Sequence, residues 1–145
     1  MTGRAFFENV ADALVNFLPP SRRNFSHYCT SANLKLWYGA ERKEHYEVQH
    51  IRSRGALEIG FHAEHGNRAR NDDVVAQLLA AEKKWRRTLG SDVEVGPFIG
   101  AQSGSWRRVS EVWRAAHWDS DEATAVDAAE RLAIYINAFE PIRTI

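Results

Sequence analysis

The sequence predicts an α+β fold: a single antiparallel sheet of about five strands with helices packed on one face, in the order α-βββ-α-ββ-α. Short runs rich in β-branched and aromatic residues follow one another with turn-like separators, which is typical of an antiparallel meander. Other segments carry apolar residues at spacings of three and four, which is typical of helices that bury one face. Residues 1–145 form one predicted domain, because no linker or internal repeat divides the chain.

The first predicted element is an amphipathic helix from Ala5 to Leu18, which Pro19 and Pro20 end. Its inner face carries Phe6, Val10, Ala13, Leu14 and Phe17. Three predicted strands follow, over residues 33–39, 44–52 and 56–64, with "AERK" and "SRG" as the turns between them.

The third of these strands alternates between two kinds of side chain. Leu57, Ile59, Phe61 and Ala63 share one face, and Glu58, Gly60, His62 and Glu64 share the other. We therefore expect a core face and a polar face that is open to solvent.

A long helix is predicted to begin at Asn71, which would cap it, and to end at Gly90. Its inner stripe consists of Val74, Leu78, Ala81, Trp85 and Leu89. Two further strands are predicted over residues 93–102 and 105–115, on either side of an "SGS" turn, and Pro97 favours an edge or a bulge for the first.

The final helix is predicted to start at a capping box made by Asp119 and Glu122 and to end before Pro141. Its stripe consists of Val126, Ala129, Ala133, Ile136 and Phe139.

Charge and cysteine content restrict the classes of function. The 19 basic and 19 acidic residues cancel, so nucleic acid or anionic lipid would need a local basic patch rather than a bulk field. The single cysteine, Cys29, fits a reducing compartment, and the N-terminal segment lacks the apolar run of a signal peptide or membrane span. We therefore expect a cytoplasmic protein that does not associate with membranes.

The segment "EIGFHAEHGNRARND" is rich in metal-ligating side chains. His62 and His65 lie three residues apart, an odd offset that sends them to opposite faces of a strand, so this local pair cannot share an ion unless a bulge intervenes. A cross-strand site remains, in which His45 and Glu47 lie beside Glu58 and His62 and bind zinc, iron or manganese. The alternative is that these four residues simply cover the solvent face of the sheet.

Arginine recurs beside tryptophan in the second half of the chain. Such pairs suit single-stranded nucleic acid, because arginine binds phosphate and tryptophan stacks on an unpaired base. The candidate residues are Trp106, Arg108, Arg114, Arg68 and Arg70. By alternation, Trp106 and Arg108 share a face, while Arg107 points toward the helices or the edge of the sheet.

The pieces "LEIGFHAEHGNRARND", "LLAAEKKWRRTLGSDVEVG" and "AAERLAIYINAFEPIRTI", within Leu57 to Ile145, resemble a family of uncharacterised bacterial domains often attached to restriction-type nuclease modules. The resemblance implies an accessory role near DNA processing or phage defence. It assigns no site residues, because the family's catalytic groups belong to the attached module.

No P-loop, dinucleotide fingerprint, nucleophile elbow or H-E-x-x-H occurs in the sequence, and we expect no cofactor. The sequence leaves three functions open. The favoured one is a non-catalytic binding module that contacts nucleic acid or a nucleic-acid-processing protein. The alternatives are a metal-dependent enzyme with the cross-strand site, and a structural domain that forms a homodimer through its open sheet face.

Overall fold

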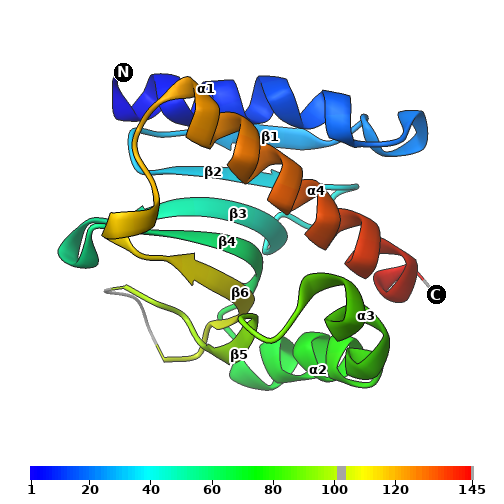
Figure 1. Cartoon of the computed structure of the whole chain (residues 1–145). Coiled ribbons are helices and arrows are strands. Elements are labelled where there is room, and N and C mark those ends of the chain that lie inside the picture. Colours follow the sequence, from blue (N-terminus) through cyan, green and yellow to red (C-terminus); the bar gives the residue numbers. More distant parts are fainter. Residues whose placement is uncertain (101–103, 145) are drawn as a thin grey trace.

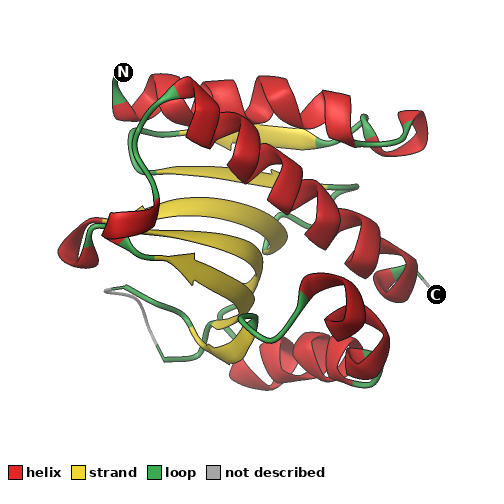
Figure 2. Ribbon diagram, in the orientation of Figure 1, coloured by secondary structure: helices red, strands yellow, loops and turns green. Residues whose placement is uncertain are grey.

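The structure, a computed structural model, describes residues 1–100 and 104–144. Its centre is a six-stranded antiparallel sheet in the order β1-β2-β3-β4-β6-β5, with helices covering one face (Figures 1 and 2). The strands are β1 (Ser26–Cys29), β2 (Asn33–Trp37), β3 (Glu44–Ile51), β4 (Ala56–Ala63), β5 (Glu94–Pro97) and β6 (Arg107–Trp113). The α-helices are α1 (Gly3–Leu14), α2 (Arg68–Leu79), α3 (Glu82–Leu89) and α4 (Glu122–Arg143). The predicted fold class is confirmed.

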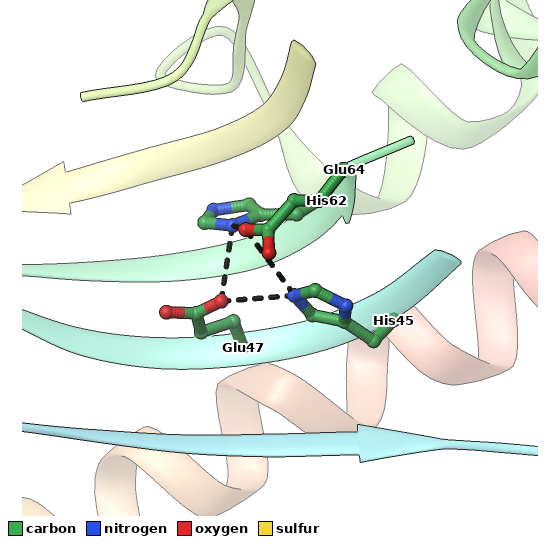
Figure 3. Close-up of side chains that lie close together, drawn as sticks. All are labelled: His45, Glu47, His62 and Glu64. Carbon is green, nitrogen blue, oxygen red and sulfur yellow. Dashed lines mark hydrogen bonds and ion pairs between the residues drawn. The ribbon is translucent and has the colours of Figure 1, made fainter. Parts of the chain in front are cut away.

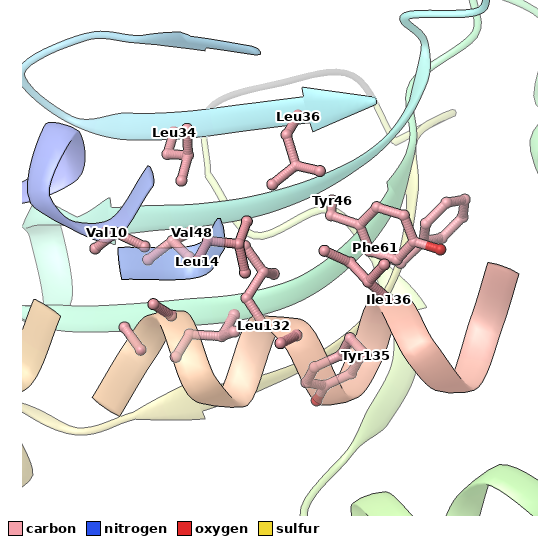
Figure 4. Packing of buried hydrophobic residues seen from close by; sticks show 14 of the residues in the cluster. Val10, Leu14, Leu34, Leu36, Tyr46, Val48, Phe61, Leu132, Tyr135 and Ile136 are labelled. Carbon is pink, nitrogen blue, oxygen red and sulfur yellow. The ribbon is translucent and has the colours of Figure 1, made fainter. Parts of the chain in front are cut away.

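The core lies between the sheet and the helices α1 and α4 (Figure 4). The sheet contributes the fully buried Leu34, Leu36, Tyr46, Val48, Ile59, Phe61 and Val109, and the helices contribute Val10, Leu14, Leu132 and Ile136. Burying one such side chain stabilises the fold by roughly 1.5–3 kcal/mol. Helices α2 and α3 lie beside the β5–β6 edge of the sheet (Figure 1).

Two predicted helix starts are wrong by a few residues. Asn67, not Asn71, caps α2, since its side chain accepts a hydrogen bond from the backbone N–H of Arg70. Asn71 is instead buried, and its amide bonds to the backbone of His65 and Ser105. The final helix α4 is capped by Asp121, which accepts from the Thr124 N–H, and not by Asp119.

The predicted long helix is two helices, because Ala80 and Ala81 form a turn between α2 and α3. The turn lets the Trp85 indole donate a 2.8 Å hydrogen bond to the carbonyl of Leu78 at the end of α2. Leu78, Trp85 and Leu89 are buried as the stripe predicts. No sequence signal marks this break, because no glycine or proline stands there.

Helix α4 continues through Pro141 to Arg143, past its predicted end. Tertiary contacts hold the last turn: Arg143 pairs with Glu44 of β3 at 2.9 Å, and Gln77 of α2 donates to the carbonyl of Ile142. Val126, a predicted residue of the inner stripe, is 44% exposed, whereas the other four predicted stripe residues of α4 are buried.

At the N-terminus the α-helix ends at Leu14, before the predicted Leu18, and residues 15–17 form a 3₁₀ turn. Strand β1 was not predicted. Strands β5 and β6 are shorter than predicted, and residues 101 and 102 of the predicted strand and 103 of the predicted turn lie outside the described residues. Among the helices of the described chain, none has the length and apolar character to cross a membrane.

Candidate metal centre

The pairing of β3 with β4 brings polar side chains together on the sheet face opposite the helices. His45 lies directly opposite His62, and Glu47 lies opposite Gly60. Gly60 has no side chain, and a Cβ there would lie 2.5 Å from the carbonyl oxygen of Val109 on β6. The missing side chain therefore allows β4 and β6 to approach closely and leaves space beside Glu47.

Four side chains converge on one point of this face (Figure 3). Single ligand atoms of His45, Glu47, His62 and Glu64 all lie within 4.8 Å of one another. Glu47 Oε1 is 2.9 Å from His45 Nε2 and 3.1 Å from His62 Nδ1. Glu64 Oε2 is 3.5 Å from His45 Nε2 and 2.9 Å from His62 Nδ1. Ligand atoms of a tetrahedral zinc site lie about 3.3 Å apart, so these separations suit one small ion.

The ring nitrogens that point away from this cluster are held by hydrogen-bond acceptors. His45 Nδ1 lies 2.8 Å from the carbonyl oxygen of Arg42, which can only accept, so Nδ1 carries a proton. His62 Nε2 lies 2.8 Å from a carboxylate oxygen of Glu58. This is the arrangement of metal-ligating histidines, whose second nitrogen donates to a carbonyl or a carboxylate.

Glu58 is itself fixed by further donors. Its carboxylate accepts a 2.5 Å hydrogen bond from the hydroxyl of Ser110 on β6 and another from the amide of Gln49 on β3. The orientation of His62 is therefore set by three strands of the sheet rather than by one side chain.

The polar face is buried, which contradicts the prediction that it is open to solvent. His62 is 0% exposed and Glu47 is 2% exposed. Two aromatic side chains cover this face: the Phe98 ring packs edge-on against the His62 ring at 5.4 Å, and Trp106 packs against Phe98 at 5.3 Å. Polar residues on one face of a strand predict a solvated surface, whereas here they find hydrogen-bond partners in one another.

The charges of the buried cluster balance. Three carboxylates, from Glu47, Glu58 and Glu64, face three basic groups, from Lys35, His45 and His62. Lys35 Nζ lies 2.8 Å from Glu64. The cluster is thus neutral when both imidazoles are protonated.

The pKa values of the cluster reflect this pairing. Burial acts to lower the pKa of His62, but the charges of Glu58 and Glu47 outweigh it and raise the pKa well above 6.5. Burial likewise opposes the shift at His45, where bonds to Glu47 and Glu64 raise the pKa. Burial acts to raise the pKa of Glu64, but hydrogen bonds with His45 and His62 lower it to about 2.

His45 and Glu64 of the cluster line a pocket of about 500 Å³. The pocket therefore borders one side of the cluster.

The structure brings together all four predicted metal ligands but changes their roles. His45, Glu47 and His62 face the common point, while Glu58 binds the far side of His62. Glu64 takes the fourth place, and Lys35 joins the cluster. Both lie on the polar face through the same alternation that placed the others, so the pattern contained this signal.

The five predicted nucleic-acid-binding residues fall at three separate places. Arg68 and Arg70 are exposed at the start of α2 and lie near Asp72 and Glu41, respectively. Arg114 is exposed and lines a second pocket together with Arg108. Trp106 lines the pocket at the His/Glu cluster.

Arg108 is on the polar face and Arg107 points toward the helices, as alternation predicts. The guanidinium of Arg107 pairs with Asp72 of α2 at 3.0 Å. Arg108 is only 7% exposed and donates to the Pro97 carbonyl and the Ser110 hydroxyl, so phosphate would have to displace these acceptors. Nucleic-acid binding stays a prediction.

Comparisons of the chain with protein-family models, curated proteins and solved structures find no match. The resemblance to nuclease-associated domains and the homodimer therefore also stay predictions.

Proposed function

We propose that this chain is a metal-dependent enzyme that holds one divalent transition-metal ion between His45, Glu47, His62 and Glu64. One observation carries the proposal. Two imidazole nitrogens and two carboxylate oxygens converge on one point, while the other ring nitrogen of each histidine is held by an acceptor. Side chains held in this way need little rearrangement to bind an ion.

The charge balance supports the same proposal. A divalent ion that replaces the two imidazolium protons brings the same charge as those protons, so the cluster stays neutral with Lys35 in place. Two nitrogen and two oxygen ligands suit zinc, iron or manganese rather than calcium or magnesium, which prefer oxygen alone.

The pocket supports a catalytic rather than a purely structural ion. A catalytic ion needs a position open to water or substrate beyond the four protein ligands, as in five-coordinate zinc or six-coordinate iron or manganese. Here His45 and Glu64 line the pocket, so a bound ion would be reached from that side. An ion in such a place polarises a substrate oxygen or lowers the pKa of a bound water.

Metal content and metal-dependent stability test the proposal. We expect the purified protein to contain one zinc, iron or manganese ion per chain by elemental analysis. After chelation, restoring the ion should raise Tm, because a ligand at 100 times its Kd stabilises the fold by about 2.7 kcal/mol. Glu47→Gln and His62→Gln should remove the response to metal.

Two matched substitutions serve as controls. Glu130→Gln and His27→Gln change the same residue types at exposed positions and should leave the metal response unchanged. A wild-type protein that retains no ion, and whose Tm does not change with zinc, manganese or iron, would refute the proposal. The cluster would then be a metal-free network of buried charges.

A further inference from the structure

The pocket above the His/Glu cluster combines aromatic rings with positive charge. Its walls include the rings of Tyr28, Trp37 and Trp106 and the side chains of Lys35, Arg42 and Lys43. At about 500 Å³ it falls within the usual range of small-molecule sites. The chain as a whole has no net charge, so this concentration of cations is local.

The aromatic rings come from three separate parts of the chain: β1, the end of β2, and the residue that precedes β6. Tyr28 packs edge-on to Trp37 with ring centroids 6.2 Å apart. Trp106 is held through Phe98, which packs in turn on His62. A planar ring that enters the pocket would therefore meet apolar surfaces that are already in position.

Two of the cations are available to a ligand. Lys35 is engaged by Glu64, and Glu41, the other acidic residue of the lining, lies 3.3 Å from Arg70. Arg42 and Lys43 are exposed and, within the described residues, neither forms an ion pair. The Arg42 guanidinium lies over the Trp37 ring at 5.3 Å, so a charged group and a stacking surface are adjacent.

We infer that this pocket takes a small aromatic anion: a planar ring that packs against Trp37 and Trp106 and carries a phosphate or carboxylate that meets Arg42 and Lys43. Arginine binds either oxyanion in a bidentate manner, and aromatic side chains stack on planar rings. The inference rests on the proposed function in one respect: it takes the ligand of the pocket to be the substrate that reaches the metal ion. Its ring and charge contacts do not require the ion.

Calorimetric titration with four probes separates the two parts of the ligand. Adenosine 5′-monophosphate carries a ring and a phosphate, and benzoate carries a ring and a carboxylate. Adenosine offers a ring without charge, and ribose 5-phosphate offers charge without a ring. We expect at least one of the first two to bind about tenfold or more tightly than adenosine and ribose 5-phosphate. The one that binds identifies the anionic group.

Substitutions within the pocket provide matched pairs. Trp106→Leu and Arg42→Gln should each weaken binding about tenfold, whereas Trp106→Phe and Arg42→Lys, which keep the ring and the charge, should lose less. Arg87→Gln, on the exposed side of α3, should have no effect. Circular dichroism of each variant verifies that the fold is retained.

Each titration is run on the metal-loaded and the chelated protein, so that the two proposals fail separately. Absence of an ion with normal binding of the aromatic anion refutes the metal centre alone. Failure of both adenosine 5′-monophosphate and benzoate to bind the folded, metal-loaded protein refutes the pocket inference alone. Equal binding of ribose 5-phosphate and adenosine 5′-monophosphate would also overturn it, because the aromatic walls would then contribute nothing.

Discussion

His45 and His62 face each other across the β3–β4 pair, with ring centroids 5.6 Å apart. Both rings are buried, and each is held by a hydrogen bond on the side away from its neighbour. Two imidazoles at this distance would repel one another if both were protonated, but Glu47 lies within 3.1 Å of each. The pair is therefore a place where protons and a metal ion compete for the same nitrogens.

Metal affinity should rise with pH. The pKa values of His45 and His62 are raised above 6.5 in the folded protein, so binding must displace up to two protons. We expect Kd for zinc to fall by more than tenfold between about pH 6 and pH 8. Calorimetry in buffers of different ionisation enthalpy counts the protons released, and a count of zero would contradict the assignment of these nitrogens as ligands.

The same shifts set how the metal-free protein responds to pH. The pKa values of His45 and His62 are higher in the folded protein than in the unfolded chain, so their protonated rings stabilise the fold. This stabilisation is fully present below about pH 6.5 and is lost as the pH rises through the pKa values of the folded protein. Zinc should therefore increase Tm more at high pH than at low pH. His62→Gln should abolish this trend.

Glu58 should matter for metal binding although it is not a ligand. Glu58→Gln removes the negative charge that faces His62 Nε2 and turns the oxygen that accepts from Gln49 into a donor, so the His62 ring loses its charged, firmly held partner. We expect zinc affinity to fall about 10- to 100-fold, as for other groups that orient metal ligands. Glu130→Gln, at an exposed glutamate on α4, should leave the affinity unchanged.

Gly60 should not tolerate a side chain. A Cβ would lie 2.5 Å from the carbonyl oxygen of Val109 and 2.6 Å from the Cα of Ser110, so β6 would have to move. We expect Gly60→Ala to reduce the free energy of unfolding by roughly 1–3 kcal/mol, as overpacked sites do. Gly96→Ala, where a Cβ meets nothing within 4 Å, is the control in urea denaturation.

Much of the sheet could be predicted from the sequence, because the alternation of polar and apolar side chains shows which face of the sheet each residue lies on without knowledge of the strand register. It placed Glu58, His62 and Glu64 on one face and the apolar residues of β4 on the other, and both assignments hold. The register of the strands and the burial of the polar face could not be predicted. The direct pairing of His45 with His62 depends on the whole β3–β4 ladder, and burial of the polar face depends on Phe98 and Trp106, which belong to a later segment.

The errors in the helices have a similar origin. Asn67, Asn71, Asp119 and Asp121 are all chemically able to cap a helix, and only the tertiary structure decides which of them does. Strand β1 has just four residues, mostly exposed, so it carries no alternating pattern. It forms by pairing with β2.

Asp119 and Asp121 lie two residues apart near the start of α4, but only the side chain of Asp121 caps the helix. Asp121 accepts a 2.8 Å hydrogen bond from the Thr124 N–H, whereas only the backbone of Asp119 takes part in hydrogen bonds at this helix start. Asp121→Ala should therefore lower Tm, and Asp119→Ala should leave it near the wild-type value. Thermal unfolding followed by circular dichroism measures Tm of both variants. A larger decrease in Tm for Asp119→Ala than for Asp121→Ala would show that Asp119 caps the helix, as the sequence predicts.

Trp85 joins three helices and should be among the most sensitive positions in the core. It is 1% exposed, its indole N–H bonds to Leu78 at the end of α2, and its ring packs against Phe139 of α4 at 5.5 Å. Trp85→Ala would leave a cavity and an unfilled acceptor, so we expect a loss of roughly 3–5 kcal/mol in the free energy of unfolding. Leu79→Ala, at a side chain 40% exposed on α2, should change it by less than about 0.5 kcal/mol. Urea denaturation of both variants measures the difference, and a loss below about 1 kcal/mol at Trp85 would show that α3 does not pack against α4 in this way.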